Sequence, residues 1–264
     1  MSTQTKAMTG VFQCPLRLLN RRIRVLLVGV GGTGSNIYDA LVNLHHGLVA
    51  VGHEYGLDVV CMDDDTVSLA NIGRQRFVYS DIGQYKSTTL VNRYNLAYGL
   101  NWTSVTDRFG IADMSRDFDL LITCVDNIET RRSIGQYLKH QRSRSKQFES
   151  DQLWLDFGNS STDGQVVLGH CYNNACRLPN VYDLYPELDT KQEDNKPSCS
   201  LEEAIASQDL YINRTLADAG INLIWQLLRK GKLDHHGAFL NLTTSELKPL
   251  KISQQIWEFM GYAA

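Results

Sequence analysis

An α/β fold with a doubly wound, mostly parallel sheet and antiparallel strands at its C-terminal end is the fold class that the sequence predicts. Short apolar runs alternate with segments of helical periodicity through much of the chain, a pattern that is typical of such sheets. The last two apolar runs, 237–242 and 247–252, instead follow each other closely and predict an antiparallel pair. A glycine-rich turn after the first apolar run is typical of a nucleotide-binding, Rossmann-like unit.

The other elements follow from local patterns. Continuous apolar runs predict strands that are buried on both faces, at 24–29, 58–62 and 119–125. Two shorter runs predict strands at 154–157 and 165–168, around a turn at Gly158 and Asn159. Apolar residues at helical spacing predict helices from the glycine turn to about residue 44, and over 84–98, 129–147 and 205–227.

We expect a single domain over residues 1–264, because 43% of the residues are hydrophobic and can form one large core. Between residues 171 and 200 the composition shifts to Asn, Asp, Glu and Pro with little periodicity. We interpret this segment as a long crossover loop and not as a linker between domains. Segments of this length without regular structure are uncommon inside compact domains and are usually functional.

Charge and composition exclude several classes of protein. Lys and Arg number 26 and Asp and Glu number 29, so the net charge is −3 at pH 7, which argues against nucleic acid as an obligatory partner. No apolar run reaches the roughly 18 residues of a membrane helix, so no membrane partner is expected. Residues 1–10 lack the apolar core of a signal peptide. Six scattered cysteines argue against a disulfide scaffold, and we therefore expect a cytoplasmic protein.

The glycine-rich turn is a G-x-G-x-x-G motif formed by Gly29, Gly31 and Gly34. Glycines let the backbone turn tightly and approach a phosphate, and the following helix N-terminus favours an anion. The acidic residue expected to hold a ribose is Asp63, which ends the second strand. It lies further along the chain than the usual distance of about 20 residues, and we interpret residues 45–56 as an insertion before that strand. The three histidines of this insertion lack suitably spaced ligand partners, so no metal is expected there.

The residues that follow the second and third strands suit a polyphosphate. Asn71 and the planar guanidinium of Arg74 can bind phosphate oxygens, and Lys86 supplies a point charge. Asp126 and Asn127 follow the third strand, at the sheet edge where ligands bind in open α/β sheets. Mg²⁺ in nucleotide sites is usually held by one carboxylate among phosphates, which makes Asp126 the candidate metal ligand. Each residue alone is typical of a surface ion pair or a helix cap, but their occurrence in this order favours a nucleotide site.

These motifs resemble those of the ThiF/MoeB and ubiquitin-activating E1-like adenylating superfamily. The resemblance extends over residues 24–252 and includes the glycine motif, Pro-Ser-Cys-Ser at 197–200 and Asn-Leu at 241–242. Its most specific part is the block Asp-x-Asp-Thr-Val-Ser-x-x-Asn-x-x-Arg-Gln at 63–75. The motifs Gly-x-x-Lys and Cys-x-Asp-Asn-x-x-x-Arg, which end at Lys86 and Arg131, also match. The chain length and residues 197–213 are similar to those of the ThiF-family member of the bacterial PRTRC systems.

The resemblance implies an E1/ThiF-like fold and an ATP-dependent adenylyltransferase that releases pyrophosphate. The implied substrate is a ubiquitin-like protein or another carboxylate-bearing protein, which is activated as an acyl adenylate. Homodimerisation is implied as well. The cofactors implied are ATP and Mg²⁺, with Mg²⁺ held by Asp126. The resemblance places Asp63 on the ribose and Asn71, Arg74 and Lys86 on the triphosphate. The full set of implied nucleotide-binding residues is Gly31, Gly32, Asp63, Asn71, Arg74, Lys86, Asp126 and Asn127.

The chain departs from the family pattern in its cysteines. Many relatives carry two Cys-x-x-Cys pairs that bind a structural zinc, whereas Cys171 and Cys176 are the one pair here, so structural zinc is not expected. Cys199 lies in the crossover loop, where relatives that form thioesters carry a cysteine. A helix starting near Leu201 would lower the pKa of Cys199 and favour a catalytic role as acyl acceptor. A cysteine at a helix start without chemistry is the equal alternative.

Other interpretations stay open. Relatives borrow an arginine from a partner subunit, placed before the first strand, but Arg17, Arg21 and Arg22 do not match its spacing. A catalytically silent E1-like scaffold is an alternative, although its nucleotide-binding residues should be degraded and here they are intact. An NAD-dependent oxidoreductase is a weaker alternative, because it gives no reason for Arg74 or Lys86. The same fold also hosts enzymes that adenylate small molecules or modify tRNA.

Overall fold

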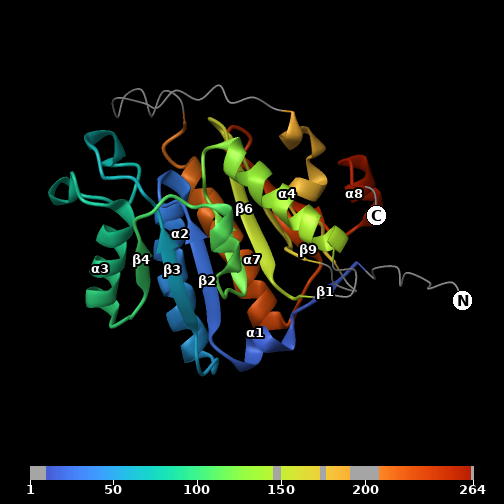
Figure 1. Cartoon of the computed structure of the whole chain (residues 1–264), viewed down its shortest axis with the longest axis horizontal. Helices are drawn as coiled ribbons and strands as arrows, with labels where there is room; N and C mark the ends of the chain where they lie inside the picture. The colour runs from blue at the N-terminus through green and yellow to red at the C-terminus, as the bar shows by residue number, and fades with distance from the viewer. Residues whose placement is uncertain (1–9, 145–149, 173–176, 191–207, 263–264) are drawn as a thin grey trace, which may run out of the picture.

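A mixed sheet of eight strands lies at the centre of the protein (Figure 1), in a computed structural model that describes residues 10–144, 150–172, 177–190 and 208–262. The strand order is β10-β9-β7-β6-β5-β2-β3-β4. The parallel strands are β2 (Ile23–Val28), β3 (Leu57–Met62), β4 (Thr103–Val105), β5 (Leu120–Thr123) and β6 (Leu153–Asn159). The antiparallel strands are β7 (Asp163–His170), β9 (His235–Asn241) and β10 (Glu246–Lys251). The predicted fold class is confirmed.

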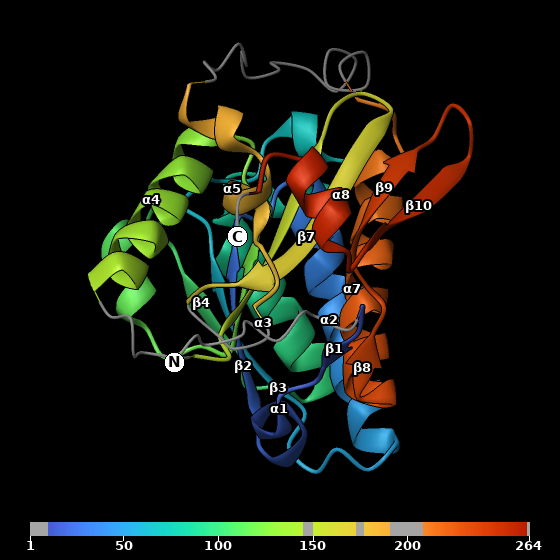
Figure 2. The same ribbon diagram turned by 90° about the vertical axis from the view of Figure 1, so that its right-hand side faces the viewer.

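Helices cover both faces of this sheet (Figure 2). On one face α2 (Gly32–Ala50) packs along α7 (Ile212–Lys230), and on the other lies α4 (Ile128–Arg144). A further helix, α3 (Lys86–Tyr98), packs beside β3 and β4. The shorter helices are α1 (Leu16–Asn20), α5 (Val181–Leu184), α8 (Gln254–Phe259) and the 3-10 helices η1 (Leu69–Asn71), η2 (Tyr79–Asp81), η3 (Ile111–Ser115) and η4 (Pro186–Asp189). None of the described helices is both long and apolar enough to cross a membrane.

The central strands explain why the apolar runs are continuous. Leu27 in β2 and Leu121 and Ile122 in β5 are completely buried, because helices cover the parallel part of the sheet on both faces. Outside the main sheet, β1 (Phe12–Gln13) pairs with β8 (Lys232–Leu233) and ties the N-terminal residues to the end of α7. Pairs as short as β1 and β8 leave little signal in the sequence, and they were not predicted.

The predicted end of the first helix at about residue 44 is wrong, because α2 continues to Ala50. The interpretation of residues 45–56 as an insertion stays a prediction. The helix does not end at Gly47, which lies against the Trp225 ring of α7: a Cβ there would be 3.6 Å from the ring, an ordinary van der Waals distance. The ring nitrogens of His45 and His53 bond to the backbone of Leu57 and Leu18, at 3.0 and 2.8 Å. These two histidines therefore fasten the end of α2 to its neighbours.

Other boundaries also differ from the prediction. Gly158 and Asn159 lie within β6, paired with Gln165 and Gly164, so the turn comes at residues 160–162. The predicted crossover loop, 171–200, contains α5 and η4, which pack against α4. The predicted start of the long helix at residue 205 is wrong for residues 208–211, which form a turn before α7 begins at Ile212. Residues 173–176 and 191–207 lie outside the described residues, so the prediction at 205–207 cannot be compared.

The strand order decides where a ligand can bind. Because β2 lies between β3 and β5, the chain leaves β2 toward one side of the sheet and returns to β5 on the other. In doubly wound sheets a crevice opens outside the carboxyl ends of the strands at such a point. The glycine turn follows β2 at this edge, and Asp63 and Asp126 follow β3 and β5.

Candidate nucleotide-binding site

The glycine turn leaves open space at the start of α2. Gly29 has a φ of +83°, which favours glycine, and a Cβ on Gly34 would lie 1.9 Å from the carbonyl oxygen of Gly29. These two glycines are therefore required by the turn itself. A Cβ on Gly31 would meet no atom of the described residues within 4 Å. The backbone N–H groups at the helix N-terminus and this open space suit an anionic group.

Asp63 is held directly against this turn. Its carboxylate accepts hydrogen bonds from the backbone N–H of Val30, at 2.6 Å, and of Asp65, at 3.0 Å. Burial raises the pKa of Asp63, whereas these hydrogen bonds and the charge of Lys86 lower it. The carboxylate thus joins the end of β3 to the glycine turn, which is where the prediction placed it.

Lys86 lies beside the same strand end. Only 6% of the residue is exposed, and its Nζ lies 2.8 Å from the Asp65 carboxylate, whose side chain is 68% exposed. The hydroxyl of Ser87 donates to the backbone carbonyl of Asp63 at 3.0 Å and fixes the start of α3 against β3. Lys86 therefore has a buried stem and an ammonium group whose counter-charge lies in solvent.

Arg74 supplies a second cation. Its Nη1 donates to Oε1 of Gln208 at 3.2 Å, and its Nε is buried without a hydrogen-bond partner in the described chain. Burial lowers the pKa of Arg74, and the charge of Asp126 raises it, so these two groups interact electrostatically. Asp126 is exposed between β5 and α4. The charge of Asp126 thus acts on Arg74, and a shared role of the two in nucleotide binding stays a prediction.

The two predicted asparagines have local structural roles. The side-chain oxygen of Asn71 accepts from the backbone N–H of Ser68 at 2.9 Å and from its hydroxyl at 3.2 Å. That of Asn127 accepts from the backbone N–H of Thr130 at 2.8 Å, as an N-cap of α4 does. These bonds use the amide oxygens and not the NH₂ groups. A role of the NH₂ group of either residue in nucleotide binding stays a prediction.

A buried ion pair fixes the segment that carries Asp126. Arg131 donates from Nε to both carboxylate oxygens of Asp156, at 3.0 Å, and from Nη2 to the carbonyl of Val125, at 2.8 Å. Asp156 is 1% exposed, and burial raises its pKa while Arg131 lowers it. Arg131 therefore holds the backbone next to Asp126 in place. Arg131 was part of a motif match in the sequence, but no role was predicted for it.

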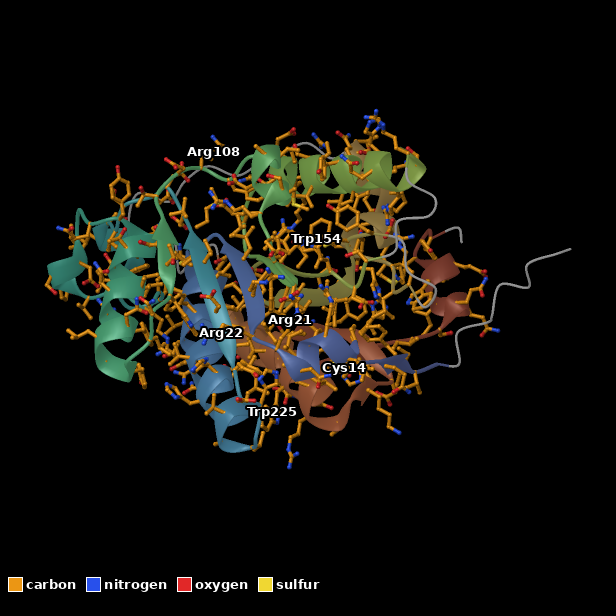
Figure 3. All side chains as sticks on the ribbon, turned by 60° about the horizontal axis from the view of Figure 1, so that its bottom comes forward. Cys14, Arg21, Arg22, Arg108, Trp154 and Trp225 are labelled. Atoms are coloured by element: carbon orange, nitrogen blue, oxygen red, sulfur yellow. The ribbon has the colours of Figure 1, made fainter. Side chains whose placement is uncertain are left out.

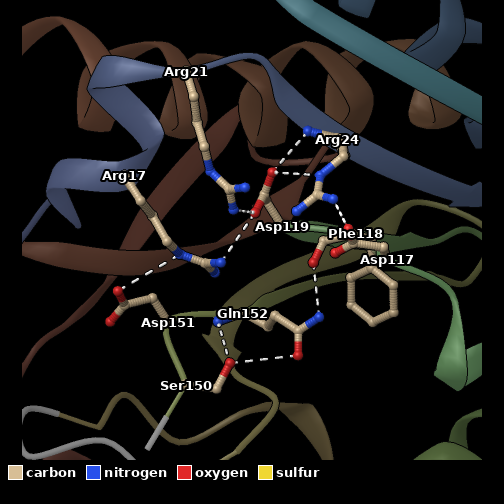
Figure 4. A network of polar contacts seen from close by, with 9 residues as sticks. All are labelled: Arg17, Arg21, Arg24, Asp117, Phe118, Asp119, Ser150, Asp151 and Gln152. Atoms are coloured by element: carbon tan, nitrogen blue, oxygen red, sulfur yellow. Dashed lines mark hydrogen bonds and ion pairs between the residues drawn. The ribbon is translucent and has the colours of Figure 1, made fainter.

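The arginines before the first strand are engaged elsewhere in this chain. Asp119, which is completely buried, accepts hydrogen bonds from Nη1 of Arg17 at 3.0 Å, Nη2 of Arg21 at 2.5 Å and the backbone N–H of Arg24 at 2.9 Å (Figure 4). Asp119 precedes β5, so this cluster lies at the amino edge of the parallel strands, opposite the glycine turn. Figure 3, with that end of the molecule turned forward, shows Arg21 and Arg22 there.

The cysteine and zinc predictions fall largely outside what the structure describes. Cys176 and Cys199 belong to the segments that are not described. Cys171 is completely buried, and burial raises the pKa of its thiol. No group of three or more His, Cys, Asp or Glu side chains that could hold a metal ion occurs among the residues with described positions. Any Mg²⁺ at Asp126 therefore needs further ligands from a bound phosphate.

The structure reveals one group of site residues that the sequence did not predict. Thr33, Asn213 and Gln208 form a chain of hydrogen bonds from the start of α2 to Arg74. These uncharged side chains come from distant parts of the chain. The one available signal was that Gln208 and Asn213 stand close together before a strongly amphipathic helix.

Comparison with known proteins connects the chain to one family. The ThiF family matches residues 10–255. Over 124 residues the chain is 30% identical to the ubiquitin-activating enzyme E1-like protein of Saccharomyces cerevisiae, covering 44% of this chain and 18% of that protein. Over 128 residues it is 25% identical to the tRNA threonylcarbamoyladenosine dehydratase of Haemophilus influenzae, covering 46% and 45%. The chain thus spans less than half the length of either relative.

Solved structures show a similar fold. The structure of E. coli MccB with ATP superposes with a TM-score of 0.56 at 11% sequence identity, covering 88% of this chain and 64% of that one. At this identity the likeness concerns the fold alone. The chain covers less than two thirds of that protein as well.

Proposed function

The chain belongs to the ThiF family, and from this premise we propose that it is an ATP-dependent adenylating enzyme that activates a carboxylate. The observation that carries the proposal is the pair of largely sequestered cations, Arg74 and Lys86, beside the open space at Gly31. Neither is neutralised by a buried carboxylate among the described residues: Lys86 pairs with the exposed Asp65, and Arg74 bonds to a neutral amide. Two such cations next to a helix N-terminus suit a triphosphate better than the diphosphate of NAD.

In this proposal the phosphates of ATP lie over Gly31 and Gly32, and Asp63 receives the ribose hydroxyls. Arg74 and Lys86 bind the outer phosphates, and Lys86 exchanges Asp65 for a phosphate oxygen. Asp126 fits a magnesium ion shared with the phosphates, because it is an exposed carboxylate at the strand end and lies near Arg74. Magnesium at this place would neutralise phosphate charge.

The proposed reaction is adenylation. A carboxylate oxygen of the substrate attacks the α-phosphorus of ATP and forms a new P–O bond. The bond from that phosphorus to the bridging oxygen breaks, and pyrophosphate leaves with the electron pair. The role of Arg74 and Lys86 is to stabilise the charge that grows on the leaving pyrophosphate, which positioned cations do well in a site with little water. We propose the C-terminus of a ubiquitin-like protein as the carboxylate, because the yeast relative is named as a ubiquitin-activating enzyme.

Calorimetric titration with Mg·ATP and with NAD tests which of the two nucleotides the protein binds. We expect saturable binding of Mg·ATP and none of NAD by the wild-type chain. Arg74→Ala should weaken ATP binding at least tenfold, since a hydrogen bond to a charged group contributes about 1.5–3 kcal/mol. Arg214→Ala is the matched control, because Arg214 is 58% exposed on α7 and its ion pair with Asp218 lies on the helix surface. Binding of NAD without ATP would contradict the proposal.

A second experiment tests transfer to Cys199. If this thiol accepts the acyl group from the adenylate, incubation with ATP and a candidate ubiquitin-like protein should give a conjugate that reducing agents cleave on a gel. Cys199→Ser should lose that conjugate and keep the exchange of labelled pyrophosphate into ATP. Full product formation by Cys199→Ala would show that the enzyme stops at the adenylate. Exchange without any conjugate in the wild type would give the same answer.

A further inference from the structure

A chain of three hydrogen bonds connects the start of α2 to Arg74. The hydroxyl of Thr33 donates to Oδ1 of Asn213 at 2.8 Å, and Nδ2 of Asn213 donates to Oε1 of Gln208 at 3.4 Å. The same Oε1 accepts from Nη1 of Arg74 at 3.2 Å. These hydrogen bonds thus join the glycine turn, the start of α7 and the cation assigned above to the triphosphate.

Asn213 is the fixed point of this chain. It is 3% exposed in the first turn of α7, and its Oδ1 also accepts from Nδ2 of Asn159 at 3.4 Å. A Cβ on Gly32 would lie 2.8 Å from both Cγ and Nδ2 of Asn213. The absence of a side chain at Gly32 therefore makes room for Asn213. This contact sets the distance between the starts of α2 and α7.

The backbone next to Gln208 is anchored independently. The N–H of Asp209 donates to the carbonyl of Ser161 at 2.8 Å, and the Asp209 carboxylate accepts from the N–H of Tyr211 at 3.0 Å. Gln208 is thus held by the turn between β6 and β7 on one side and by Asn213 on the other. Its side-chain oxygen has a defined place before any ligand binds.

The chemistry of Gln208 suits a group that orients a cation without neutralising it. Its amide oxygen is uncharged, and it forms the one hydrogen bond that Arg74 makes within the described residues. A carboxylate at this distance would form an ion pair and reduce the attraction of Arg74 for a phosphate. A neutral acceptor fixes the planar guanidinium and leaves its positive charge for the ligand.

We propose that Gln208 is a positioning residue for Arg74 and that Asn213 holds Gln208 in register with the glycine turn. This inference rests on the proposed function, because it assigns Arg74 to the triphosphate of ATP. It makes the start of α7 part of the nucleotide site, although α7 is far from the glycine motif in sequence. A ligand or substrate that moves the start of α7 would thereby move Arg74.

The test compares Gln208→Ala, Gln208→Glu and the control Gln226→Ala in the full chain. Gln226 lies on α7, the helix that follows Gln208, and its side-chain oxygen likewise accepts from a cation, Lys230, at 3.1 Å on the surface. We expect Gln208→Ala to weaken Mg·ATP binding about tenfold and to leave adenosine binding unchanged. Gln208→Glu should keep Arg74 ordered but weaken Mg·ATP binding at least as much. Gln226→Ala should change neither.

Two measurements separate positioning from a merely structural role. In the Arg74→Ala background, Gln208→Ala should add no further loss, because Gln208 acts through Arg74. The second measurement is the ¹⁵N signal of the Arg74 side chain in the ligand-free protein, which is assigned with Arg74→Lys. This signal should report an ordered side chain in Gln226→Ala, as in the wild type, and a disordered one in Gln208→Ala. Additive losses, an equal loss of adenosine binding, or an unchanged Arg74 signal would each overturn the proposal. If the wild type binds no Mg·ATP, the proposed function fails, and the Arg74 signal still decides the positioning.

Discussion

Replacing single glycines in the turn separates what the protein needs from what a ligand needs. In Gly34→Ala the new Cβ would lie 1.9 Å from the carbonyl oxygen of Gly29, and real Cβ atoms essentially never approach within 3.0 Å. The turn and α2 must therefore separate by roughly 1 Å, an overpacking of the kind that costs about 3 kcal/mol. For a chain of this size that corresponds to a fall in Tm of about 6–12 °C.

Gly31→Ala should behave in the opposite way. Its Cβ would meet nothing within 4 Å in the part of the chain that the structure describes, so we expect a change in the free energy of unfolding of less than about 1 kcal/mol. The same methyl group would occupy space that we assign to the phosphates of ATP, and Mg·ATP binding should fall at least tenfold. Differential scanning calorimetry and titration calorimetry measure the two effects. A large fall in Tm for Gly31→Ala, or undiminished ATP binding, would refute the assignment of this space to a ligand.

Three further predictions concern Lys86, the Asp119 cluster and the buried histidines. Lys86→Met should keep Tm within about 3 °C, since the ion pair with exposed Asp65 contributes little to stability. The same variant should lose most Mg·ATP binding by calorimetry, and retained affinity would contradict the role of Lys86. Asp119→Asn removes the negative charge that three arginines share and should lower the free energy of unfolding by about 2–3 kcal/mol in urea titrations. An unchanged midpoint would argue against a stabilising role of this cluster. Burial lowers the pKa of His170 to about 3 and of His236 to about 4, so below pH 6.5 the unfolded chain binds protons that the folded chain does not. The free energy of unfolding should then fall by about 1.4 kcal/mol per pH unit for each histidine between pH 6 and 4, and a flat profile in urea titrations would be incompatible with these pKa values.

The parts of the fold that were predictable are those whose burial is decided locally. A strand covered by helices on both faces must be apolar throughout, so β2 and β5 were visible as continuous runs. Boundaries that depend on a distant partner were not predictable. The helix α2 passes Gly47 and packs there against Trp225 of α7, and no local pattern around Gly47 indicates that contact. Similarly, Gly158 and Asn159 look like a turn, but pairing with β7 keeps them in a strand.

The candidate site divides in the same way. Charged residues that follow strand ends could be predicted to meet, because the carboxyl ends of parallel strands share one edge of the sheet, and Asp63 and Lys86 do meet there. Gln208 and Asn213 could not be predicted. Neutral amides are common at helix starts, and their meaning here depends on how α7 packs on α2. Their partner Arg74 lies more than a hundred residues away in the chain.

The two cations of the site are held in different ways, and this has a consequence for binding. Lys86 is paired with a carboxylate in solvent, so a phosphate must displace Asp65 before it gains the full charge of the ammonium group. Arg74 is held by a neutral amide, so its orientation is set beforehand and no hydrogen-bonded carboxylate among the described residues has to be displaced. Groups that are oriented before a ligand arrives lose less entropy on binding. If the triphosphate binds here, Arg74 should therefore contribute mainly through preorganisation, and Lys86 through the exchange of one anion for another.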